Sequence, residues 1–213
     1  ATLIIGTILE QVGLLIGGNI GQVLAVGAAA AKVMTGAGIG VGVASRFQES
    51  VLVTVSSACA GMIGAYASKI MAGTLIVKGA VVLSGPGEPL GAFLAAYVGI
   101  ELGRLISGRT QLDILLTPLM TILSGGAVGL FLGPWISQLM ARLGDLIRWG
   151  TEQQPFLMGI VVSVLMGMAL TLPISSAALG VILNLSGIAA GAAAVGCSAQ
   201  MIGFAVASFR ENR

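Results

Sequence analysis

The sequence predicts an all-α integral membrane protein, a polytopic helix bundle of roughly six to eight spans with interrupted or re-entrant segments. Three observations lead to this fold class. Only 8% of the 213 residues are charged, whereas soluble domains average about 25%. The mean hydropathy of the chain is +1.04. The run from Gln153 to Phe209 holds no Asp, Glu, Lys or Arg over 57 residues, so it can cross a bilayer twice at about 20 residues per crossing.

The N-terminal part of the chain predicts closely packed helices. Ala1–Ile16 is largely apolar and is expected to form a first helix. Gly17–Ala44 is rich in small residues, and the glycines at every second position over 36–42 include pairs four residues apart, the spacing that lets helices approach closely. Val51–Ser68 is an apolar stretch of 18 residues and is a further predicted span.

The middle of the chain alternates apolar stretches with helix breakers. Lys69–Ser84 is apolar except for two lysines, and we interpret it as a short or tilted span whose lysines reach the interfaces. Ser84–Pro89 holds two prolines and two glycines in six residues and cannot continue a helix. Leu90–Ile106 resumes as a helix, in which Glu101 and Arg104 are spaced to form a structural ion pair.

The next stretch predicts a span followed by an interfacial helix. Ile114–Leu132 is strongly apolar, and Gly133–Pro134 is expected to end it. Residues 135–150 then place basic residues opposite leucines, as in an amphipathic helix at the membrane surface. Trp135 and Trp149 at the two ends of this segment fit the aromatic belt of a membrane interface.

The long uncharged run is interrupted near its middle by Thr171–Ser176, which contains Pro173. Proline removes a backbone donor, so in lipid the freed carbonyl needs a partner inside the protein. We therefore expect helix, interruption and helix, with the break facing the protein interior or a water-filled cavity.

Composition disfavours several functions. The net charge of +2 comes from scattered residues without a basic block, which argues against a nucleic-acid partner. Cys59 and Cys197 lie in apolar surroundings and the chain has no histidine, so no metal site is expected. No catalytic triad or nucleotide loop can be assembled. We expect no cofactor, no metal and no catalytic residue on this chain.

Two breaker-rich segments are the places where such a protein can expose polar groups to a solute, because transporters build binding sites from interrupted helices. Glu88 stands between Gly87 and Pro89, so its carboxylate either faces a cavity or lies in water at the interface. The second segment adds three hydroxyls, and the uncharged run holds two lone amides, which suit interhelical hydrogen bonds equally well. The predicted substrate site therefore consists of Glu88, Thr171, Ser175, Ser176, Asn184 and Gln200.

Several motifs along essentially the whole chain carry a family resemblance: Gly87–Phe93, Thr117–Pro118, Gln154–Ile160, Thr171–Ala177, Gly203–Phe204 and Phe209–Asn212. With them the chain resembles the small enzyme-IIC-like membrane family of the bacterial phosphotransferase system. The resemblance implies a multi-pass permease subunit of the bacterial cytoplasmic membrane that translocates a sugar or a related hydroxylated solute. It also allows separate IIA and IIB components as partners.

The resemblance bears on individual residues as well. In the better-known sugar-translocating subunits of this system a glutamate on a Gly/Pro-flanked loop and a histidine contact the sugar. Glu88 looks like that glutamate, whereas no histidine is present to match the second group or to carry phosphate. A non-transporting sensor or oligomeric scaffold that keeps the permease fold therefore stays open as an alternative.

Three further expectations concern the organisation of the chain. Residues 1–213 are predicted to form a single permease-like domain. Members of the family continue beyond this C-terminus, so the chain is expected to be a fragment of a longer protein. A homo-oligomer in the lipid bilayer is expected.

Overall fold

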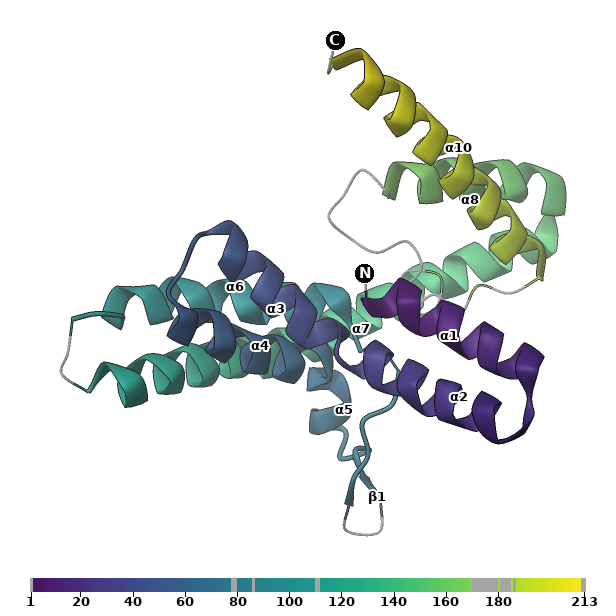
Figure 1. Cartoon of the computed structure of the whole chain (residues 1–213). Helices are drawn as coiled ribbons and strands as arrows, with labels where there is room; N and C mark the ends of the chain where they lie inside the picture. The colour runs from purple at the N-terminus through teal and green to yellow at the C-terminus, as the bar shows by residue number, and fades with distance from the viewer. Residues whose placement is uncertain are drawn as a thin grey trace. The chain divides into compact units, whose positions relative to one another are not determined.

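The computed structural model in Figure 1 describes residues 2–77, 80–85, 87–109, 112–169, 180, 185 and 187–211. It divides into two compact units, Ala1–Ser137 and Gln138–Arg213. The regular elements of the described part are helices apart from one small hairpin, which confirms the predicted all-α membrane fold.

By length and composition, three described helices or helix segments could cross a membrane: Pro89–Ile106, Asp113–Arg142 and Gly187–Glu211. A fourth results if the bent pair Gly18–Val33 and Thr35–Arg46 counts as one span. Three further described helices are apolar but shorter: Ile5–Ile16, Val51–Ala65 and Pro155–Ala169. The total of six to eight spans stays a prediction.

The chain begins with a helical hairpin of α1 (Thr2–Ile16) and α2 (Gly18–Val33) (Figure 1). Gly17 and Gly18 form the turn with φ of 64° and 62°, where glycine is favoured because it has no Cβ. Lys32 on α2 forms an ion pair with Glu10 on α1. Pairing the two charges lowers the cost of placing either of them in an apolar hairpin.

Three helices build the core of the first unit: α3 (Thr35–Arg46), α4 (Val51–Ala65) and α6 (Pro89–Ile106). Glycines let them approach closely. A Cβ added at Gly61 of α4 would stand 2.5 Å from the carbonyl oxygen of Gly36, and one at Gly91 of α6 would stand 2.6 Å from that of Gly64. Of the predicted glycine pairs, Gly36 and Gly40 serve close packing on α4, whereas a Cβ at Gly42 would meet no atom of the described residues within 4 Å.

Lys69–Ser84 does not form the span that we predicted. It begins within α5 (Ala67–Met71) and continues into an antiparallel hairpin of β1 (Ile76–Val77) and β2 (Ala80–Val81). The predicted span Val51–Ser68 is likewise divided, because α4 ends before Tyr66. Gly73 has φ of 67° just after α5, and the β-branched residues that follow favour strands over helix.

The predicted helix end at Gly133–Pro134 is also wrong, because α7 (Asp113–Gln153) is one helix of 41 residues. Pro134 removes a single backbone donor, and tertiary packing outweighs that local signal. A Cβ at Gly133 would stand 2.5 Å from the Cβ of Ala67, so α7 is pressed against α5 at this point. Residues 135–150 are thus the C-terminal part of α7, and their place at an interface stays a prediction.

In the second unit, α8 (Pro155–Ala169) packs on α10 (Gly187–Glu211). Gly196 has no room for a Cβ beside the backbone of Ser163, and Val162, Met166 and Ala193 form a small core. The predicted interruption at Thr171–Ser176 lies outside the described residues, so it stays a prediction.

Candidate functional site

Glu88 lies in a non-helical segment at the N-terminal end of α6, as the sequence predicted. Gly85 and Gly87 precede it with φ of 76° and 68°, a backbone conformation that residues with a Cβ rarely adopt. A Cβ at Gly87 would also stand 2.7 Å from the carbonyl oxygen of Ala65. The backbone N–H of Glu88 donates a 2.7 Å hydrogen bond to that oxygen, so the segment is fixed against the end of α4.

The Glu88 side chain is half-buried and meets groups from two other elements. The hydroxyls of Ser137 on α7 and Ser68 on α5 lie near it, as does the Lys69 ammonium. Burial raises the pKa of the Glu88 carboxyl above its ordinary value, while the Ser137 and Ser68 hydroxyls and the Lys69 charge act in the opposite direction.

Two side chains anchor the loop that carries Glu88. The buried Tyr66 hydroxyl donates a 2.5 Å hydrogen bond to the carbonyl of Gly85. The Lys69 ammonium donates to the carbonyl of Ser84 at 3.0 Å and lies 5.6 Å from the centre of the Tyr66 ring. Backbone carbonyls outside regular structure are thus paired with side chains, which a segment at the end of an apolar helix requires.

Most of the other predicted site residues lie outside the described part of the chain, namely Thr171, Ser175, Ser176 and Asn184. Gln200 is described and lies half-buried on α10, in the second unit. The prediction that these residues share one cavity with Glu88 is therefore untested. Glu101 and Arg104 meet as expected for a pair, with Arg104 Nη2 3.2 Å from Glu101 Oε2.

Sequence reasoning missed the groups that surround Glu88. Ser68 and Lys69 were assigned to the ends of predicted spans, and Ser137 was placed beyond a helix end that does not exist. One signal in the sequence could have found Ser137, namely its distance of four residues from Gly133. In a continuous helix this spacing puts both residues on one face.

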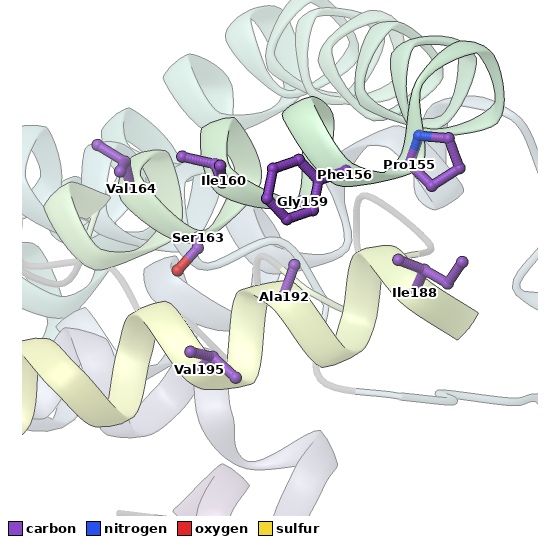
Figure 2. Close-up of a pocket in the computed structure, with 9 residues that line it drawn as sticks. All are labelled: Pro155, Phe156, Gly159, Ile160, Ser163, Val164, Ile188, Ala192 and Val195. Atoms are coloured by element: carbon purple, nitrogen blue, oxygen red, sulfur yellow. The ribbon is translucent and has the colours of Figure 1, made fainter.

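The second unit holds an apolar groove of about 590 Å³ between α8 and α10 (Figure 2). Figure 2 shows side chains of both helices along it, and Ser163 supplies the one side-chain hydroxyl among the described lining residues: Pro155, Phe156, Gly159, Ile160, Ser163, Val164, Ile188, Ala192 and Val195. Such a lining satisfies few hydrogen bonds, so this groove does not suit a polyhydroxylated solute.

Within the described residues, no group of three or more His, Cys, Asp or Glu side chains could hold a metal ion. The polar groups near the Glu88 carboxylate are instead possible hydrogen-bond donors, namely Ser68, Lys69 and Ser137.

Comparison with known proteins bears on the whole chain. A sequence model with the description "Phosphotransferase system, EIIC" matches residues 1–213. No curated protein and no solved structure matches the chain.

Proposed function

The chain belongs to the phosphotransferase-system EIIC family, and from that premise we propose that it translocates a sugar or a related hydroxylated solute through a site built on Glu88. Family membership makes it a multi-pass membrane permease subunit of this system. The finer assignment is supported by one observation above all: Glu88 is half-buried in a non-helical segment that a backbone hydrogen bond holds against the end of α4.

The position of Glu88 suits the recognition of hydroxyl groups. Its carboxylate accepts hydrogen bonds and donates none, so it complements solutes that are rich in O–H donors. It also lies where α6 begins, and the N-terminus of a helix favours a negative charge. Transporters commonly place their binding groups at such helix ends.

The proposal extends to the residues and partners that were predicted from the sequence. Thr171, Ser175 and Ser176 would line the same cavity, with Asn184 or Gln200 nearby. Separate IIA and IIB components would supply the phosphoryl group, since this chain has no histidine to carry one. The membrane would be the bacterial cytoplasmic membrane, and the protein would act as a homo-oligomer.

Uptake by the purified protein in liposomes tests this function, with a panel of labelled sugars as solutes. Glu88→Gln should lower uptake about tenfold or more, because a hydrogen bond to a charged group contributes about 1.5–3 kcal/mol. Glu101→Gln is the matched control, since it makes the same chemical change in a surface ion pair of the same helix. It should transport like the unmodified chain.

Full transport by the Glu88→Gln protein would overturn the proposed site. If no labelled sugar crosses with the unmodified, folded protein, the permease assignment fails and the sensor or scaffold alternative gains support.

A further inference from the structure

The apolar groove between α8 and α10 owes its shape to small residues that stand among larger ones. Gly159 and Ala192 lie opposite each other, and a Cβ added at Gly159 would be 4.0 Å from the Cβ of Ala192. One helical turn further along, Gly196 has no room for a Cβ beside the backbone of Ser163. The two contacts follow in the same order on both helices, so α8 and α10 run in the same direction. The small pair leaves space between them, which larger side chains of both helices line (Figure 2).

The larger lining side chains are apolar and exposed. Each of them has an exposed fraction between 51% and 81%, namely Phe156, Ile160, Val164, Ile188 and Val195. They belong to a helix that could cross a membrane, α10, and to a shorter apolar helix, α8. In a membrane protein such side chains contact acyl chains instead of water. The groove is therefore continuous with the surface through which this protein contacts lipid.

The length of the groove matches one leaflet of a bilayer. From Pro155 to Val164 it follows α8 for about 13 Å, at a rise of about 1.5 Å per residue. One leaflet contributes half of the hydrocarbon core, which is about 15 Å. An acyl chain that extends through one leaflet is therefore about as long as the groove.

The groove has a polar end, where α8 begins. Gln153 and Gln154 come directly before Pro155 and are exposed, and the exposed Trp149 lies one helical turn before Gln153 on α7. Tryptophan favours the membrane–water interface, and glutamine amides can donate and accept hydrogen bonds with lipid headgroups. Polar groups followed by an apolar groove of leaflet length match the order of headgroup and tail in a phospholipid.

We propose that this groove binds one acyl chain of a bilayer phospholipid, with the headgroup at the end marked by Gln153 and Gln154. A chain between two helices contacts protein on both sides, so it gains more dispersion energy than a chain beside a single helix. The helix pair does not need the lipid to form, because Val162, Met166 and Ala193 pack α8 and α10 together. The site shares no residue with the site proposed around Glu88.

Photo-crosslinking in vesicles tests the site. The unmodified protein is reconstituted in phosphatidylethanolamine and phosphatidylglycerol, together with a rising fraction of phosphatidylglycerol that carries a diazirine in one acyl chain. Peptide mass spectrometry then locates the label. Labelling of residues 156–164 and 188–195 should saturate at a low fraction of the probe. Labelling of residues 201–209, an exposed apolar part of α10, should rise in proportion to the probe.

A variant that fills the groove supplies the second arm of the test. With Gly159→Leu, labelling of the groove should fall to the level of residues 201–209 and should no longer saturate. Gly191→Leu is the matched control, because a Cβ at Gly191 of α10 would meet no atom of the described residues within 4 Å. Its labelling should equal that of the unmodified protein. If Gly159→Leu does not fold, Ala192→Leu carries the same comparison.

Three results would overturn the inference. Groove labelling that rises in proportion to the probe would indicate an ordinary lipid-facing surface. Saturable labelling that Gly159→Leu and Ala192→Leu leave unchanged would place the lipid elsewhere. A groove that stays unlabelled while residues 201–209 are labelled would be covered by protein, either another part of this chain or a second copy. None of these results bears on sugar uptake, so this inference and the proposed function can fail separately.

Discussion

Two helices of nearly equal hydropathy, α6 and α10, have very different surroundings. Mean hydropathy is 1.4 for the first and 1.5 for the second, and both are long enough to span a membrane. In α6, 44% of the apolar 18-residue stretch is buried, whereas in α10 the described residues bury 11% of it. Hydropathy reports transfer from water to an apolar medium and does not distinguish protein from lipid.

Small residues explain the difference. Gly91, Gly99 and Gly103 of α6 each lie where an added Cβ would meet a neighbouring helix. In α10, Gly196 is packed against α8, but a Cβ added at Gly191 or Gly203 would meet no atom of the described residues within 4 Å. The glycines of an apolar helix therefore do not predict close packing by themselves, because the packing depends on which helix lies beside them. The site around Glu88 is built on α6, the closely packed helix.

The largest expected effect comes from filling a close contact between α4 and α6. Gly64→Ala places a Cβ 2.5 Å from the Cβ of Ala95 and beside the backbone of Gly91, so overpacking should lower stability by about 3 kcal/mol. Gly203→Ala on α10 meets no atom of the described residues within 4 Å and should raise stability by up to about 1 kcal/mol. Thermal unfolding in detergent, followed by circular dichroism, measures both, and equal effects would contradict the comparison.

A smaller effect is expected where the loop meets α6. Gly87→Ala combines a positive φ with the close carbonyl of Ala65, whereas Gly73→Ala has nearly the same φ of 67° and no atom of the described residues within 4 Å of the added Cβ. The shared φ cost is about 1–2 kcal/mol, and the clash adds to it at Gly87 alone. Each variant loses some unfolding free energy relative to the unmodified protein, and the difference between the two losses measures the contact of Gly87 with Ala65. This difference should be near zero if the loop is not pressed against α4.

The smallest expected effect is the pH dependence of Glu88. Burial raises the pKa of this carboxyl in the folded protein, so the folded state binds the proton more tightly than the unfolded state. The ionised group therefore lowers stability at pH above the raised pKa, and this penalty disappears as the pH falls below the unfolded pKa. Glu88→Gln should be the more stable protein at neutral pH, by an amount that shrinks toward acid.

Melting temperatures of both proteins over about pH 4 to 8 check this sign. A Glu88→Gln protein that is less stable at neutral pH would show that the carboxylate is needed for folding rather than for a solute.

Much of the fold could be predicted from the sequence, because bilayer physics acts through simple quantities. Long uncharged stretches required helices, and the spacing of small residues predicted their contacts. The loop before α6 was also predictable, since two prolines and two glycines in six residues leave no alternative.

The remainder could not be predicted, because it depends on contacts between distant residues. Pro134 looks like a helix end until the packing of Gly133 on Ala67 is known. The two lysines of 69–84 suggested snorkelling from a span, whereas Lys69 anchors a loop by donating to Ser84. Glu88 was predicted from its own neighbours in sequence, but Ser68 and Ser137 were not, since only the tertiary fold brings them to it.

A structure of the protein with a bound sugar would test the central claim most directly. We expect the hydroxyls of the sugar within hydrogen-bond distance of the Glu88 carboxylate, with Ser175 at the same cavity. A sugar seated in the apolar groove between α8 and α10 would contradict the account. So would Glu88 and Ser175 on opposite membrane faces with no cavity between them.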